Sequence, residues 1–123
     1  MAAPNIVNVA TITGITTGRA LTTALTTALV MNPASSGKAF KINSIIVANI
    51  DGTNTATATV YFFDNSQSAR FKIAAAIPVP PGTSLNVLDK NSAIYLEEGD
   101  KIEGLASAAS DLNMIVSYEE ITD

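Results

Sequence analysis

The chain has 123 residues, of which 47% are hydrophobic and only 15% are charged, and its net charge is −4. It contains no histidine, cysteine or tryptophan, which excludes disulfides, thiolate catalysis, Cys-ligated metal centres and the Ser-His-Asp triad. This length and composition predict a single folded domain, residues 1–123, that is stabilised by packing and binds neither a cofactor nor a metal ion.

The first segment, MAAPNIVNV, lacks the basic start and the continuous apolar run of a signal peptide. The runs IIVA and IAAAI are far shorter than the roughly 18 apolar residues of a membrane span, so we expect no membrane partner. Ile6–Thr13 is rich in β-branched residues and is followed by Gly14, which predicts a strand that ends there. We expect residues 1–20 to form an N-terminal arm or a swapped strand.

The next segment, Arg19–Pro33, reads RALTTALTTALVMNP. Its leucines, Leu21, Leu25 and Leu29, are four residues apart, which fits one face of a helix, but they also share the parity of a strand. The threonines between them favour a strand, because branching at Cβ restricts χ1 in a helix and packs well on a pleated surface. We predict a strand here, followed by a loop at NPASSGK (32–38).

Phe40–Ile50 alternates apolar and polar residues, except that Ile45 and Val47 make its centre apolar on both faces. This pattern predicts an interior strand covered on both faces, or a strand whose second face meets another subunit. Asp51–Asn54, DGTN, is followed by the strictly alternating segment Thr55–Phe63. Turn residues between two strand patterns predict a β-hairpin.

Ala69–Ile77 follows the turn DNSQS and alternates again, with Arg70 and Lys72 outward, before PVPPG ends the strand. Four further strand patterns complete the chain: 84–88, 93–96, 101–107 and 112–121. Eight or nine short strands separated by turns predict an all-β protein, an antiparallel two-layer β-sandwich of jelly-roll-like form. We expect these residues in its core: Phe40, Ile42, Ile46, Phe71, Ile73, Ile77, Leu96, Ile102, Met114 and Val116.

The stretch YLEEGDKIEG, residues 95–104, places four carboxylates around one glycine. It lies between two predicted strands, so we expect a solvated hairpin tip. It does not match a calcium-binding loop, and an exposed tip lacks the burial that raises the pKa of a catalytic acid. Changing Glu97, Glu98 and Asp100 to amides is therefore expected to leave folding nearly intact.

Other signatures of chemistry are incomplete. ASSGK (34–38) lacks the full phosphate-binding pattern, and no S-x-x-K or G-x-S-x-G motif occurs. We therefore predict that the protein is not an enzyme. A carbohydrate-binding module that contacts the host surface is an alternative, in which at least two of Tyr61, Tyr95 and Tyr118 are exposed on one surface and stack on sugars.

Charge is divided unevenly along the chain. Residues 1–50 carry three bases and no acid, whereas residues 51–123 carry four bases and eleven acids. The division reflects either chance and local turn chemistry, or a contact between the first part of one copy and the later part of a neighbour. The acidic balance predicts no nucleic-acid partner.

The segments KAFKINSIIVANIDGTN (38–54) and AIYLEEGDKIEGLASAASDLNMIVSYEEI (93–121) resemble small β-rich virion structural proteins of tailed bacteriophages, particularly phages of cyanobacteria and marine bacteria. The resemblance implies a protein present in many copies on the virion, assembled in the host cytoplasm. Its expected role is that of a capsid decoration (cement) protein that binds the major capsid protein and stabilises the shell, or alternatively of a neck or tail accessory protein. It also implies a homotrimer, because such decoration proteins commonly occupy local three-fold positions.

No functional residue is carried over from that resemblance. The residues expected to contact other copies or the particle come from the apolar and acid-free parts of the chain: Ile6, Val7, Val9, Arg19, Ile45 and Val47. A two-layer sandwich has no third layer of its own to cover strands that are apolar on both faces, so a partner is expected to cover them.

Overall fold

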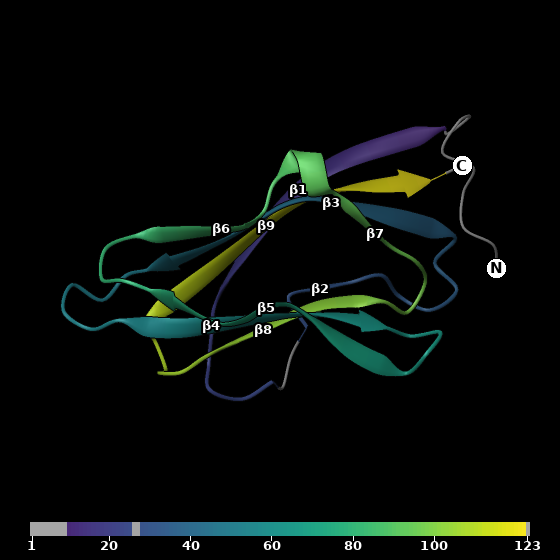
Figure 1. Ribbon diagram of the computed structural model, residues 1–123. Coiled ribbons are helices and arrows are strands. Elements are labelled where there is room, and N and C mark those ends of the chain that lie inside the picture. Colours follow the sequence, from purple (N-terminus) through teal and green to yellow (C-terminus); the bar gives the residue numbers. More distant parts are fainter. Residues whose placement is uncertain (1–9, 26–27, 123) are drawn as a thin grey trace.

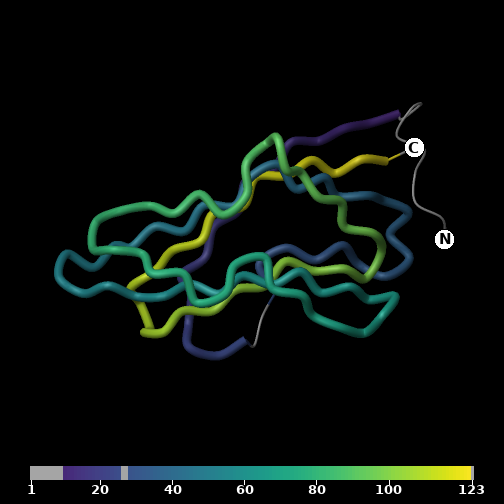
Figure 2. Tube along the Cα trace, viewed as in Figure 1, coloured from purple at the N-terminus to yellow at the C-terminus, as the bar shows by residue number. Residues whose placement is uncertain are grey.

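The computed structural model describes residues 10–25 and 28–122, and these form two antiparallel sheets packed face to face (Figures 1 and 2). The strands are β1 (Thr11–Ala20), β2 (Val30–Met31), β3 (Lys38–Asn49), β4 (Ala56–Asp64), β5 (Ala69–Val79), β6 (Ser84–Leu88), β7 (Ile94–Leu96), β8 (Lys101–Ala106) and β9 (Leu112–Thr122). A short 3-10 turn, η1 (Lys90–Ser92), separates β6 from β7. The predicted all-β, two-layer antiparallel sandwich is confirmed.

The strand order is that of a jelly roll. The first sheet, here called the β3 sheet, has the order β1-β9-β3, with β6 and β7 pairing successive parts of the far edge of β3. The second, the β4 sheet, has the order β2-β8-β4-β5. Strands β1 and β9, β2 and β8, β3 and β6, and β4 and β5 pair antiparallel, so the chain runs as one long hairpin folded over into two Greek keys.

One hydrophobic core fills the space between the sheets. Six of the predicted core residues are buried in it: Phe40, Ile42, Leu96, Ile102, Met114 and Val116. Ile73 is partly buried against the core, whereas Phe71 and Ile77 are exposed and Ile46 is half-buried on the outer face of the β3 sheet. The last three predictions were wrong, because a bulge in β3 moves Ile46 to the outer face and because Phe71 and Ile77 lie on β5, an edge strand.

The first bulge lies in β3. Its register against β9 shifts between Ile42 and Ser44, so Ile42 faces the core before the bulge and Ile45 and Val47 face it afterwards. One extra residue moves every following side chain to the opposite face. The strand is thus apolar on both sequence parities because its inward parity changes. Ile45 and Val47 are fully buried within their own chain, so their predicted role in contacting a partner was wrong.

The second set of irregularities lies in β5, an edge strand. Its register against β4 shifts on both sides of Val60, and Ala76 has a φ of 47°. Phe71 lies in the regular part of the pairing, opposite Phe62, and Ile77 lies opposite Ala58. They are 48% and 37% exposed because β5 is the edge strand of its sheet and has no neighbour on its other side among the described strands. The alternation of buried and exposed residues predicted for Ala69–Ile77 is therefore not found in β5.

The N-terminal predictions are corrected in part. β1 runs through Gly14 to Ala20 and pairs with β9 of the same chain, so the strand does not end at Gly14. Arg19 is exposed on this strand, while the predicted contact residues Ile6, Val7 and Val9 lie outside the described residues. Among the described residues of the segment predicted as a strand from Arg19 to Pro33, which exclude 26 and 27, only the end of β1 and the two residues of β2 are in strands.

Two predicted hairpins are connections between sheets. Residues 50–55 join β3 to β4, and residues 97–100 join β7 to β8, and in both cases the two strands belong to different sheets. Residues 65–68 do close a hairpin, between β4 and β5. Turn residues reveal where the chain reverses, but whether the flanking strands pair depends on contacts from elsewhere in the chain.

Candidate functional site

The acidic turn lies where three connections meet at one end of the sandwich. Asp100 is 3% exposed, and its two carboxylate oxygens accept hydrogen bonds from the backbone N–H groups of Asn65 and Glu97, each at 2.9 Å. Glu98 Oε2 accepts a hydrogen bond from the Gly37 N–H at 2.8 Å. The carboxylates therefore hold together the β2–β3, β4–β5 and β7–β8 connections. The prediction of a solvated hairpin tip was wrong.

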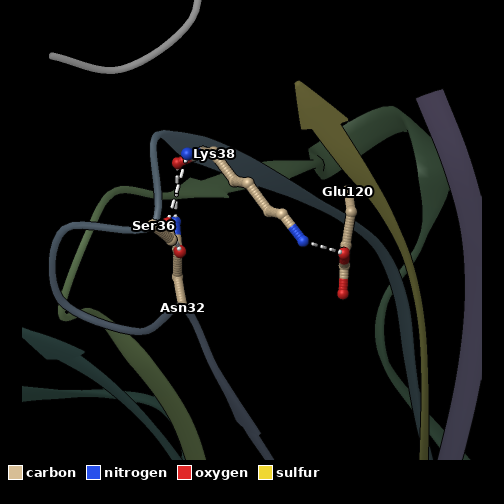
Figure 3. A network of polar contacts seen from close by, with 4 residues as sticks. All are labelled: Asn32, Ser36, Lys38 and Glu120. Atoms are coloured by element: carbon tan, nitrogen blue, oxygen red, sulfur yellow. Dashed lines mark hydrogen bonds and ion pairs between the residues drawn. The ribbon is translucent and has the colours of Figure 1, made fainter. Parts of the chain in front are cut away.

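Asn32 is the centre of this polar cluster and is completely buried. Its Nδ2 donates to the carbonyl oxygens of Lys38 at 2.8 Å and Leu96 at 3.0 Å, while its Oδ1 accepts from the Ser36 hydroxyl. Figure 3 shows Asn32 and Ser36 on the loop that leads into β3, and Lys38 reaching to Glu120 of β9, where Nζ and Oε1 are 3.0 Å apart. The Asn32 N–H also donates to the Asp100 carbonyl at 3.0 Å.

A second buried asparagine, Asn49, bonds backbone groups of the loops at the opposite end of the sandwich. Asn49, the last residue of β3, is 3% exposed. Its Nδ2 donates to the carbonyls of Asn54 at 2.9 Å and Val79 at 2.8 Å, and its Oδ1 accepts from the Asp51 N–H at 2.8 Å. Each end of the jelly roll is thus tied by one buried amide, because a short amide side chain can satisfy backbone donors and acceptors together.

Glu103 is also buried, with 3% of its surface exposed. Arg70 Nε lies 2.7 Å from Glu103 Oε1, and Arg70 Nη2 lies 3.3 Å from Oε2. The hydrogen bond and the charge of Glu103 raise the pKa of Arg70. The guanidinium also lies 5.1 Å from the ring centre of Phe63, and Lys101 Nζ lies 4.9 Å from it. The ion pair and the two cation–ring contacts therefore lie together on one face of the β4 sheet.

The buried carboxylate of Asp100 changes the effect on stability that is expected from replacing Glu97, Glu98 and Asp100 with amides. In Asp100→Asn, one of the two accepting oxygens becomes an NH₂ donor that faces a backbone N–H. Leaving a buried donor unsatisfied costs about 1 to 3 kcal/mol. Near-neutrality is therefore no longer expected for the Glu97, Glu98 and Asp100 triple change, and the loss is expected to come mainly from Asp100.

Gly99 allows this turn to close. Its φ is 88°, and a Cβ at this position would lie 2.6 Å from Asn65 Nδ2. We expect Gly99→Ala to destabilise the fold by about 2 to 4 kcal/mol, because left-handed strain is added to a steric clash. Gly82→Ala is the matched control: its φ is 68° but nothing lies within 4 Å of the added Cβ, so only about 1 to 2 kcal/mol is expected. Urea titration of the two variants measures this difference, and equal losses would contradict the role of the clash.

The described residues contain no group of three or more acidic side chains arranged to hold a metal ion. In that same part of the chain, no helix is long and apolar enough to cross a membrane.

The tyrosines are dispersed. Tyr61 is half-buried on β4, where it pairs across to Glu103, and Tyr95 is 43% exposed on β7 of the other sheet. Tyr118 stacks on Phe40, with ring centres 5.3 Å apart, and burial raises its pKa. The structure therefore does not bring two exposed tyrosines onto one surface, as the carbohydrate-binding alternative requires.

An apolar groove of about 380 Å³ opens between the edges of the two sheets. Its lining comes from β4, β5 and β7: Phe62, Phe71, Lys72, Ile73, Ile94 and Tyr95. Sequence reasoning missed this site because it placed Phe71 and Ile73 inside a closed core. No local signal connects them to Ile94, since β5 and β7 are separate in sequence and lie at the edges of different sheets.

Comparisons of the chain with protein-family models, with curated protein sequences and with solved structures find no match.

Proposed function

We propose that this protein is a non-enzymatic virion structural protein of a tailed bacteriophage, acting as a capsid decoration (cement) protein. In this role, a homo-oligomer, a trimer by the resemblance described above, binds the major capsid protein and stabilises the shell. The neck or tail of the particle is the alternative location.

The observation that carries the non-enzymatic, scaffold part of the proposal is the use of polar side chains in the end loops. In a jelly roll the loops at the ends of the sandwich are natural places for a ligand site, because binding and catalytic residues are disproportionately found on loops. Here three polar side chains are buried and form hydrogen bonds with backbone groups of neighbouring segments: Asn32, Asn49 and Asp100. Such bonding supports a rigid scaffold rather than a reactive centre.

The jelly-roll fold is compatible with this role. Jelly rolls occur in viral capsid proteins, but also in lectins and cupins, and a fold alone does not define a function. The phage assignment therefore rests on the sequence resemblance, and the scaffold role rests on the bonded end loops.

The test is to locate the protein on particles of the phage that encodes it. Antibody or nanogold labelling of a tagged chain, followed by cryo-electron microscopy, is expected to show regularly spaced density over the capsid shell. A particle carrying the tag on another virion protein is the labelling control. Signal confined to the neck or tail would support the alternative location, and purified virions without signal would overturn the proposal.

A further inference from the structure

The register of the β4 sheet arranges its outward side chains in rows. Alternate residues of a strand share one face of the sheet, and residues directly opposite each other on antiparallel strands share it too. One row therefore crosses all four strands: Met31, Lys101, Phe63 and Arg70. The next outward row holds Glu103, Tyr61 and Lys72. Both rows face away from the core, because the residues between them pack against it: Val30, Ile102 and Phe62.

These two rows, here called the basic patch, concentrate positive charge. They carry three of the seven basic residues of the chain but only one of its eleven acids. That acid, Glu103, is 3% exposed and already bonded to Arg70. Among the described residues, neither Lys72 nor Lys101 forms an ion pair. The patch is thus positive on a protein whose net charge is −4.

The basic patch is accessible and has the residue types of a protein interface. Met31 is 47% exposed, and the side chain of Arg70 is 43% exposed. Lys72 is exposed as well, and the rings of Tyr61 and Phe63 are half-buried. Methionine, arginine and aromatic residues are enriched where proteins bind one another. The patch therefore combines apolar anchors with cations.

Two of the cations are held in position by the sheet itself. The guanidinium of Arg70 and the Nζ of Lys101 both lie about 5 Å from the ring centre of Phe63. Arg70 is fixed further by its two hydrogen bonds to Glu103. A side chain that is already positioned loses less conformational freedom on binding, so the patch is prepared for a partner whose carboxylates have a fixed spacing.

We propose that the basic patch is a docking surface for an acidic segment of another protein, and that in the virion this segment belongs to the shell protein. The cations bind its carboxylates, and the side chains of Met31, Tyr61 and Phe63 contact apolar residues between those carboxylates. The choice of the shell as the source rests on the proposed function and deepens it. The chemistry of the segment rests on the patch alone.

Two other occupants fit the patch less well. A long polyanion would extend beyond it onto a molecule of net negative charge, which repels it. A second copy of this chain offers few acids for the contact, because seven of its eleven acids accept hydrogen bonds within their own chain: Asp51, Asp64, Asp89, Glu98, Asp100, Glu103 and Glu120.

The first experiment measures binding of a defined probe to the whole protein. The probe is a short capped peptide in which glutamate and leucine alternate, and the control peptide has lysine in place of glutamate. In an NMR titration of isotope-labelled protein, the acidic peptide is expected to shift the amide signals of β4, β5 and β8 at the patch, and the basic peptide is not. Added salt is expected to weaken the binding, because it screens exposed charges.

Charge reversal locates the contact. Lys72→Glu combined with Lys101→Glu is expected to weaken binding of the acidic peptide by about tenfold or more, because two attractions become repulsions. Arg19→Glu combined with Lys90→Glu is the matched control, since it removes the same charge from exposed positions outside the patch, and only a small effect is expected. Arg70 is left unchanged because Glu103 is buried against it. Circular dichroism checks each fold, and Lys72→Gln with Lys101→Gln replaces the reversed pair if that variant does not fold.

The same proteins are then mixed with purified phage shells that lack this chain. The unaltered protein and the matched control are expected to sediment with the shells, whereas the Lys72 and Lys101 variant is expected to stay in solution. If the acidic peptide binds the patch but the unaltered protein does not bind shells, the proposed capsid role is lost and the docking surface stands.

Any of four results would overturn the inference. They are an acidic peptide that causes no shifts at the patch, a reversed variant that binds peptide and shells as tightly as the unaltered protein, heparin that binds the patch more tightly than the peptide, and self-association that only the reversed variant loses. The third result would assign the patch to a sulfated polyanion, and the fourth to a contact between copies.

Discussion

Replacing Asn32 with alanine is expected to lower the free energy of unfolding by about 3 to 5 kcal/mol. The amide is completely buried and donates to two carbonyl oxygens, of Lys38 and Leu96, that lie near the core. Alanine leaves both acceptors and the Ser36 hydroxyl without this partner. A buried polar group that loses its partner costs about 1 to 3 kcal/mol, and the vacated volume adds to the loss.

Chemical denaturation with two spectroscopic probes measures this change. Asn86→Ala is the matched control, because Asn86 is an exposed asparagine on β6, and its effect is expected to stay within about 0.5 kcal/mol. Asn49→Ala should behave like Asn32→Ala, since it also leaves two carbonyls without an amide donor. A loss below 1 kcal/mol at Asn32, comparable to that at Asn86 within error, would show that the buried amide does not hold the loops.

The second large effect is expected from Phe40→Ala, with a loss of about 3 to 5 kcal/mol. Phe40 is 3% exposed and stacks against Tyr118, so its removal leaves a cavity in the core between the two sheets. Phe71→Ala is the natural comparison, because the same change is made at a ring that is 48% exposed. Its cost is expected to be about 1 to 2 kcal/mol, since roughly half of the ring surface is already in water.

This pair of phenylalanines also separates the structure from the sequence-based prediction, which placed both rings in the core. Thermal or denaturant unfolding of the two variants and the unaltered protein, at several protein concentrations, measures the two losses. Equal losses would mean that the groove around Phe71 is closed in solution. A loss at Phe71 that depends on protein concentration would instead mean that this side chain lies in a contact between copies.

Much of the architecture follows from local patterns. Period-two alternation and β-branched residues predicted strands at Phe40–Ile50 and Thr55–Phe63, and both correspond to β3 and β4. Successive side chains of a strand point to opposite faces of the sheet, so burial of one face makes alternate residues apolar. This pattern can be read from a few neighbouring residues. The segment Arg19–Pro33 shows where they fail, since its alternation continues although the chain there passes from one sheet to the other.

The candidate sites were much less accessible to prediction. The carboxylate of Asp100 is buried because loops from three parts of the chain converge on it, and the groove forms from strands that are not neighbours in sequence. Composition indicated the absence of histidine and cysteine chemistry. It contained no information on which polar residues would be enclosed.

The sequence by itself determined that this protein is an all-β sandwich, because strand alternation and turn residues are local and these agree along most of the chain. Only the tertiary structure decided the jelly-roll pairing, the parity change in β3 and the burial of Asn32 and Asp100. The physical reason is distance along the chain: Asn32 bonds Leu96 across 64 positions, and a single bulge at residues 42–44 decides which side of β3 is buried. Such contacts exist only after both sheets have formed, so no local pattern can specify them.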